Sequence, residues 1–384
     1  MNPVIFISRH LRFKGGLAMA CIAISFLVMI IAVSVSSGFR SEIRSSLSAL
    51  SGDVQLTPPD MNVLDQSRPI ERYPSYLPHI EKIDGVADIL PVVYVAGIVR
   101  QSDDIYGVLF KGLPDGREGV SIPSTLAQKA SLTVGSKLTS YFVAEKVKVR
   151  QFEVTSVYDS MLEADDRLVV YADIAQLQRL SGWTDDQVSA MEIFLDQAHK
   201  DDMAISEVSQ EIGYAVNAYS DESEAPVIAT SSVSRFPQLF DWLDLIDFNT
   251  LFILVLMTIV AGFNMISGLL IMLFENISTI GLLKSLGMTD RSISKVFLSS
   301  ASVLVLKGMA IGNALAFIFC IVQDRTHMLK LDPANYFVPY VPVNINVGSV
   351  ILADIGSFVV IMLLLLIPTL FISRVDPAQT VRMK

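Results

Sequence analysis

The sequence predicts an α+β membrane protein in which four transmembrane helices carry a large mixed α/β domain, inserted between the first helix and the second. Three observations favour this class. The 384-residue chain is 52% hydrophobic, which exceeds the usual globular range. It contains four apolar runs long enough to cross a bilayer, and between residues 52 and 220 it changes to short alternating runs.

Each apolar run reaches the roughly 20 residues that a transmembrane helix needs. The runs are Leu17–Val35, Leu251–Phe274, Val296–Val322 and Val347–Ile372. The first is longer than the apolar core of a secretion signal, about 7–15 residues, and is therefore predicted to stay as an anchor. Lys307 and Asp354 are the charged residues inside these runs. They are predicted either to pair or face the bundle interior, or to snorkel toward the membrane surface.

Basic residues near the span ends predict the orientation, because they stay on the cytoplasmic side. They precede the first run, separate the second from the third and follow the last: Arg9, Arg12, Lys14, Lys284, Arg291, Lys295, Arg374, Arg382 and Lys384. Residues 36–248 then lie outside, with 17 basic and 33 acidic residues against 12 and 6 elsewhere. In an inner membrane both termini are cytoplasmic and the large domain is periplasmic.

The external segment alternates strands with short helices. Predicted strands, rich in β-branched and aromatic residues, are Val92–Arg100, Ile105–Lys111, Lys137–Val143, Lys146–Tyr158, Arg167–Tyr171 and Met191–Leu195. Predicted helices are Tyr76–Lys82, Ser124–Ala130, Asp173–Leu180 with Asp173 as N-cap, and Met203–Ile212. Prolines predict a looped excursion over 58–78. We place domains at 1–50 (basic segment, first span and stalk), 51–232 (periplasmic core) and 233–384 (stalk and three spans).

Helical spacing continues past both membrane junctions. The apolar residues Phe39, Ile43 and Leu47 follow the first span, and Trp242, Leu243 and Ile246 precede the second. Two such stripes are predicted to pack together as a stalk. The alternative is that each only covers part of the external domain.

Several functional classes are disfavoured. The sequence has no G-x-x-x-x-G-K-[ST] phosphate loop, so the chain is not expected to hydrolyse ATP alone. Its four histidines share no metal spacing, and the acidic exterior disfavours nucleic acid. We therefore predict no catalytic, cofactor or metal residues on this chain.

Residues 275–295 between the second and third spans read as helix, tight turn, helix. Ile277, Ile280, Leu283 and Leu286 form one apolar stripe. Gly287 is predicted to end the first helix in the left-handed conformation, and Asp290 to cap the next. From the pattern alone, this helix either docks a partner or lies on the inner leaflet with Lys284 toward the headgroups.

Taken together, these segments resemble the LolC/LolE family of lipoprotein-releasing permeases, within the wider group that includes MacB and FtsX. The matching segments, in chain order, are FISRHLR at 6–12, SVSSGF at 34–39, FEVTSVY at 152–158, DIAQL at 173–177, VAGFNMIS at 260–267, the loop from Glu275 to Gly287, YFVP at 336–339 with Pro342, and DPAQTVR at 376–382. The order of the motifs is more specific than any one of them.

The resemblance implies a bacterial inner-membrane ABC permease that pairs with an identical or homologous permease and two copies of a cytoplasmic ATPase. ATP and Mg²⁺ would bind that ATPase. The partners implied are lipoprotein cargo, a periplasmic lipoprotein chaperone and membrane lipids. The loop becomes the coupling helix, with contacts implied for Glu275, Ile277, Ile280, Leu283, Lys284, Leu286 and Gly287. A MacB-like export permease and an FtsX-like signal transducer are the alternatives. Residues 58–70 and 181–189 are candidates for chaperone contact.

Overall fold

A computed structural model describes residues 16–59, 61, 68–101, 104–143, 147–159 and 168–369. It divides into two compact units, each described by itself below. The helical unit lies within residues 1–41, 242–330 and 341–384, and the sheet unit within 42–241 and 331–340. The domain limits at 51 and 232 stay a prediction, because two of the long helices, Gly16–Ser51 and Pro237–Glu275, contribute to both units.

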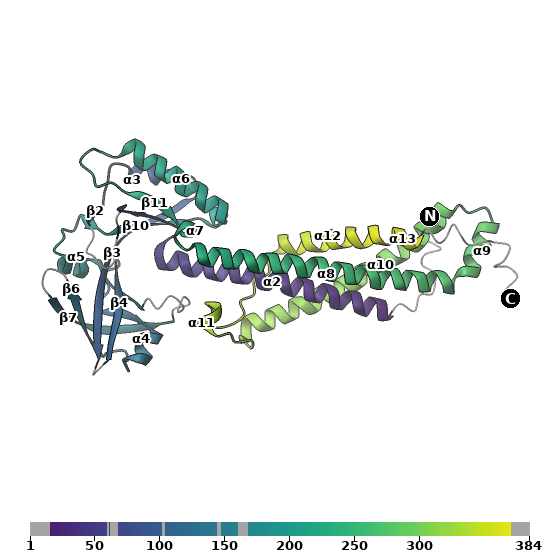
Figure 1. The fold of residues 1–384 in the computed structure, drawn as a ribbon, viewed down its shortest axis with the longest axis horizontal. Helices are drawn as coiled ribbons and strands as arrows, with labels where there is room; N and C mark the ends of the chain where they lie inside the picture. Colours follow the sequence, from purple (N-terminus) through teal and green to yellow (C-terminus); the bar gives the residue numbers. More distant parts are fainter. Residues whose placement is uncertain are drawn as a thin grey trace. The chain divides into compact units, whose positions relative to one another are not determined.

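Four long helices form the helical unit, and each is long and apolar enough to cross a membrane. They are α2 (Gly16–Ser51), α8 (Pro237–Glu275), α10 (Asp290–Thr326) and α12 (Val347–Leu364), the last followed by α13 (Leu366–Thr369). They run side by side in Figure 1. The four predicted spans are confirmed, and α2, α8 and α10 extend beyond the predicted limits. The basic residues of both termini lie outside the described residues.

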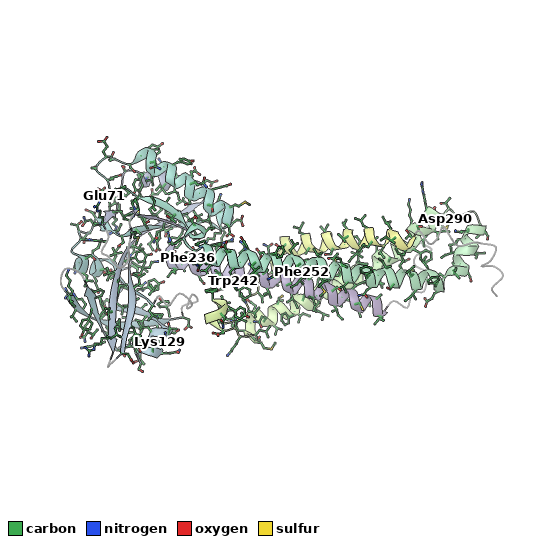
Figure 2. The ribbon with its side chains drawn as sticks, in the orientation of Figure 1. Glu71, Lys129, Phe236, Trp242, Phe252 and Asp290 are labelled. Atoms are coloured by element: carbon green, nitrogen blue, oxygen red, sulfur yellow. The ribbon has the colours of Figure 1, made fainter. Side chains whose placement is uncertain are left out.

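The core of the helical unit includes residues from all four long helices. Phe26 of α2, Met265 of α8 and Phe297 of α10 are all buried in it, as is Ile361 of α12. Other apolar side chains point away from the bundle. Phe252 of α8, labelled in Figure 2, is 63% exposed. An outward apolar surface is what lipid or another transmembrane helix would cover.

Two glycines let α10 approach α2 closely. A Cβ added at Gly312 would lie 2.5 Å from the Ala23 carbonyl oxygen and 2.9 Å from Phe26 Cβ. One added at Gly308 would lie 2.7 Å from Ile22 Cγ2. Small residues at such crossings allow backbones to pack directly in a membrane.

The sheet unit contains the predicted strands and several that were missed. The predicted ones are β3 (Val86–Gln101), β4 (Asp104–Leu113), β6 (Lys137–Val143), β7 (Val147–Tyr158), β8 (Leu168–Asp173) and β10 (Ala190–Leu195). The missed ones are β1 (Val54–Thr57), β2 (Ile70–Glu71), β5 (Val120–Pro123), β9 (Gln187–Val188) and β11 (Ile228–Ser231). β2 falls within the predicted excursion and pairs with β9. β9 thus lies within the candidate chaperone segment 181–189, and β2 begins at the last residue of the other, 58–70.

Strand β3 joins two parts of the main sheet, whose order is β11-β1-β10-β3-β4-β8-β5-β7-β6. Its first half pairs with β10 and its second half with β4. Because β3 also pairs with β6, the strands from β3 to β6 form a closed ring. Phe110, Phe142 and Phe152 pack inside the unit, with ring centroids 4.9–6.3 Å apart.

The helices of the sheet unit are α3 (Leu77–Ile80), α4 (Ser124–Lys129), α5 (Ile174–Ser181), α6 (Asp202–Tyr219), α7 (Ser232–Arg235) and α11 (Pro333–Tyr336). The predicted N-cap is confirmed, since Asp173 accepts a hydrogen bond from the Gln176 amide. The prediction for α6 stopped at Ile212, and the helix continues for two more turns.

Candidate functional site

The loop between the second and third spans contains a compact helix with a defined end. Helix α9 (Ile277–Ser285) is followed by Gly287 at φ 86°. The Gly287 amide donates to the Lys284 carbonyl and the Met288 amide to the Leu283 carbonyl, each at 3.0 Å. This pair of bonds is the Schellman closure. The predicted helix, turn and left-handed glycine are therefore confirmed.

The cap of the following helix differs from the prediction. Thr289 occupies the N-cap of α10, and Asp290 is the first residue of the helix. Asp290 instead forms an ion pair with Lys284, whose Nζ lies 2.9 Å from Asp290 Oδ1 across the turn. A carboxylate in the first turn also suits the positive end of the helix dipole. Lys284 is thus held at the turn, with 10% of its side chain exposed.

The apolar stripe of α9 points mostly inward, which corrects part of the predicted contact face. Ile280 is 1% exposed and belongs to the core of the helical unit, and Leu283 packs against that core. Leu286 is 75% exposed, and Leu282, which the sequence analysis did not select, is 57% exposed. Of the other predicted residues, Ile277 is half-buried, while Glu275 and Gly287 are exposed.

Leu282 and Leu286 are one helical turn apart and lie on one face of α9. Their spacing was visible in the sequence. A second stripe at 277, 280 and 283 competed with it, and contact with α8 and α10 decided between them. The outward face can bury apolar area against another protein or a membrane surface.

The predicted stalk residues are mostly buried. In the helical unit, Phe39 and Trp242 form an edge-to-face ring pair with centroids 5.6 Å apart. Leu243 is buried and Ile246 half-buried. In the sheet unit, Ile43 and Leu47 on α2 are also buried. These positions confirm that both helices continue beyond the predicted spans. A role in transmitting motion stays a prediction.

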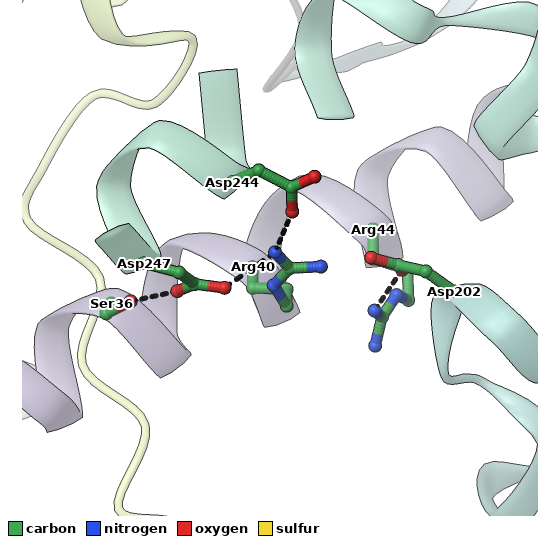
Figure 3. A network of polar contacts seen from close by, with 6 residues as sticks. All are labelled: Ser36, Arg40, Arg44, Asp202, Asp244 and Asp247. Carbon is green, nitrogen blue, oxygen red and sulfur yellow. Dashed lines mark hydrogen bonds and ion pairs between the residues drawn. The ribbon is translucent and has the colours of Figure 1, made fainter. Parts of the chain in front are cut away.

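Polar contacts that the sequence analysis did not select flank these apolar residues (Figure 3). In the helical unit, Arg40 donates to Asp244 and to Asp247, each at 2.6 Å, and Ser36 donates to Asp247. In the sheet unit, Arg44 pairs with Asp202. Partly exposed ion pairs contribute little stability individually, but a shared arginine fixes the rotation of one helix against another.

Two motifs of the resemblance meet in the helical unit. A Cβ at Gly38 would overlap the carbonyl oxygen of Pro342, and the Asn344 amide donates to the Ser34 carbonyl at 3.0 Å. Gly38 thus permits the loop before α12 to lie against α2.

The intramembrane charges are not paired with each other. Asp354 accepts a hydrogen bond from Asn313 Nδ2 at 2.6 Å, while Lys307 is exposed. No cluster of three or more potential metal ligands occurs in the described part of the chain.

The sequence is similar to one family of permeases and to two named relatives. Residues 251–377 match the FtsX-like permease C-terminal family. The chain is 22% identical to the lipoprotein-releasing system transmembrane protein LolC of Neisseria meningitidis, over 97% of this chain and 94% of the relative. It is 21% identical to LolE of Haemophilus influenzae, over 93% and 91%.

Two solved structures are similar to part of the chain. The periplasmic region of MacB from Actinobacillus actinomycetemcomitans is 11% identical, with a TM-score of 0.31, and the match covers 48% of this chain and 91% of that one. The extracellular domain of the noncanonic ABC-type transporter YknZ is 12% identical, with a TM-score of 0.30, and the match covers 46% and 99%.

The four apolar helices and the sequence relatives support a multi-pass inner-membrane protein. The family match and the relatives also support a membrane subunit of an ABC transporter, with the ATPase on a partner. Residues 251–377 thus match the FtsX-like permease C-terminal family, and the chain is similar along almost its full length to LolC and LolE.

Proposed function

We propose that this chain uses ATP hydrolysis by a partner subunit to release lipoproteins from the outer leaflet of the inner membrane, for transfer to the outer membrane. The observation that carries the proposal is similarity to both LolC and LolE over more than nine-tenths of the chain. The working complex contains two permeases, identical or homologous, and two copies of a cytoplasmic ATPase. A periplasmic chaperone accepts the lipoprotein.

The outward face of α9, defined by Leu282 and Leu286, is the docking surface for the ATPase. Its support is mechanical. Ile280 packs into the core of the helical unit, and the Lys284–Asp290 ion pair fixes the turn behind it. Because α9 is held in this way, a force that the ATPase applies to it moves α8 and α10 instead of displacing α9 alone. The basic residues beside α9 favour a cytoplasmic side for this surface and for both termini.

Paired substitutions test the docking surface. Leu286→Asp places a charge on the exposed face and is expected to abolish co-purification with the ATPase, since a desolvated charge at an apolar contact is unfavourable. Met203→Asp is the matched control, because Met203 is 74% exposed but lies on α6 of the sheet unit. Full ATPase binding by Leu286→Asp would refute the assignment.

Ile280→Ala provides a second comparison. It removes buried apolar contacts and is expected to cost about 2–5 kcal/mol of stability. Its effect on ATPase binding should therefore appear together with a lowered unfolding temperature. Leu286→Asp, by contrast, should leave that temperature unchanged.

Depletion of the chain tests the cargo. Lipoprotein release predicts that outer-membrane lipoproteins accumulate in the inner membrane. A cell-separation defect with normal lipoprotein sorting would instead indicate an FtsX-like transducer. Loss of export of another substrate with normal sorting would indicate a MacB-like permease.

A further inference from the structure

A buried ion pair lies in the sheet unit. Lys111 Nζ on β4 lies 2.8 Å from Glu192 Oε2 on β10, and their side chains are 2% and 0% exposed. Strand β3 runs between β4 and β10, and Tyr94 on it donates its hydroxyl hydrogen bond to Glu192. Gln55 Nε2 on β1 donates to the Tyr94 oxygen at 3.1 Å. The pair thus joins four adjacent strands.

The cations of this cluster point at the end of α2. Lys111 Nζ donates to the Leu50 carbonyl at 2.8 Å, and Arg235 donates to the Ser51 carbonyl at 3.5 Å. Leu50 and Ser51 are the last two residues of α2. The final carbonyls of a helix lack partners inside it and form the negative end of its dipole. Two positive side chains therefore cap one helix end from within the sheet unit.

The second long helix begins at the same cluster. Arg235 is the last residue of α7 and stands two positions before the start of α8. The Glu192 carboxylate attracts Arg235 as well as Lys111, and both attractions oppose the rise that burial causes in the pKa of Glu192. Glu192 is thus paired with the lysine that caps the end of α2. Arg235, two residues before α8 begins, donates to the Ser51 carbonyl of that end and to the Thr230 carbonyl of β11.

The backbone allows this close approach. Gly52 follows α2 at φ 70°, and a Cβ there would lie 3.0 Å from Glu192 Cβ. The Asp53 carboxylate accepts a hydrogen bond from the Leu195 amide at 2.8 Å. The end of α2 thus lies against β10, where the close approach at Gly52, the Asp53 hydrogen bond and the Lys111–Glu192 pair hold it.

Stability alone does not account for such a cluster. Replacing a buried ion pair with well-packed neutral groups is often neutral or stabilising, because burying the charges costs as much as their attraction returns. What the charges add is direction, since each hydrogen bond fixes the angle of a helix end against the sheet. Water or a single side chain would be enough to cap a helix that only anchors a domain.

We propose that Lys111, Glu192 and Arg235 are positioning residues that lock the end of α2 and the start of α8 to the sheet. Motion entering these helices then moves the sheet unit as a whole instead of bending the junction. This inference rests on the proposed function, because it assumes that nucleotide-driven motion reaches the sheet unit through both helices.

The test uses the full chain with its partner ATPase in lipid nanodiscs. Lys111→Met/Glu192→Gln removes both charges of the buried pair and leaves Arg235 in place, while Gln keeps an acceptor for the Tyr94 hydroxyl. The unfolding temperature and the ATP hydrolysis rate are expected to stay near wild type. Nucleotide-dependent movement of the sheet unit, followed by a dye pair between the two units, is expected to disappear. Release of a triacylated lipoprotein per ATP hydrolysed should fall about tenfold, within the usual range of coupling between sites.

One control variant and one further test variant accompany the double variant. Arg117→Met/Asp115→Asn removes an ion pair that lies on the exposed surface of the sheet unit, and it should change none of the four readouts. Arg235→Gln leaves the Lys111–Glu192 pair intact and loosens only the second contact. It provides an independent route if the double variant unfolds, and partial loss of movement is expected.

The outcomes separate the two proposals. Wild-type movement in both Lys111→Met/Glu192→Gln and Arg235→Gln overturns the positioning role. A wild-type complex that moves with nucleotide but releases no lipoprotein sinks the proposed function, and the movement assay still decides the positioning role.

Discussion

The contact between α10 and α2 offers a sharp test of how the helical unit is packed. The change is Gly312→Ala, which adds one methyl group 2.5 Å from the Ala23 carbonyl oxygen and 2.9 Å from Phe26 Cβ. Both neighbours are backbone or backbone-attached atoms, so neither can rotate away. The two helices must therefore separate, and the buried side chains between them lose contact.

The size of the effect follows from two opposing contributions. Overpacking a well-packed contact costs about 1–3 kcal/mol, and the higher helix propensity of alanine returns up to about 1 kcal/mol. A net loss of up to about 2 kcal/mol is expected when the full alanine gain is subtracted. Gly308→Ala should cost less, because its two nearest neighbours are side-chain carbons of Ile22, at 2.7 and 2.9 Å, and the nearest backbone atom lies 3.2 Å away. Gly356→Ala on α12 is the matched control, since nothing lies within 4 Å of its added Cβ.

The assay is heat inactivation of the purified full chain in detergent, scored by the fraction that stays monodisperse. Because membrane proteins seldom unfold reversibly, the order of the half-inactivation temperatures is compared rather than a free energy. The expected order, from most to least stable, is Gly356→Ala, wild type, Gly308→Ala, Gly312→Ala, with the last a few degrees below wild type. Equal temperatures for Gly312→Ala and Gly356→Ala would refute the packing described here.

Three further outcomes follow from local geometry. Gly287→Ala forces a side chain into the left-handed region at φ 86°, which costs about 1–2 kcal/mol. Relative to wild type, the amount of co-purified ATPase should fall by a larger fraction than the unfolding temperature does. Asp173→Ala removes the acceptor for the Gln176 amide and should destabilise the sheet unit by about 0.5–2 kcal/mol, measured as a lowered unfolding temperature. The Asp196 hydrogen bond raises the pKa of His199, so its contribution to stability is present at low pH and is lost as pH rises through that raised pKa. In the unfolded chain the imidazole has a pKa of about 6.5, so the contribution is complete below that pH and falls as the pH rises above it. The difference in unfolding temperature between wild type and His199→Gln should accordingly shrink from pH 5.5 to pH 8.

Long elements were predictable because their signal is local. Four apolar runs specify four membrane helices whatever surrounds them, and the alternating pattern of β3 and β7 specifies strands. The four-residue strands β1, β5 and β11 were missed, since four residues do not show a period. These strands form because they pair with distant neighbours in the sheet, as Val54 of β1 does with Ile193 of β10.

The candidate site was only partly predictable for a related reason. Spacing located α9 and its glycine end, but α9 carries apolar residues on more than one face. Whether Ile280 or Leu282 faces outward depends on the packing of α8 and α10. The Lys111–Glu192 pair joins residues 81 positions apart, so no local pattern in the sequence could have revealed it.

The lengths of α2 and α8 show why the junction chemistry matters. At 1.5 Å per residue the 36 residues of α2 span about 54 Å, whereas the hydrocarbon core of a bilayer is about 30 Å thick. A passive anchor needs neither the extra length nor covered apolar residues such as Phe39 and Leu243 beyond the bilayer. Nor does it need a terminal carbonyl held by a buried lysine, because water satisfies the end of an exposed helix. An ordered extension with a buried charged cap resists bending at the point where a flexible linker would absorb motion. The energetic cost of burying Lys111 is therefore best explained if motion passes through that helix end.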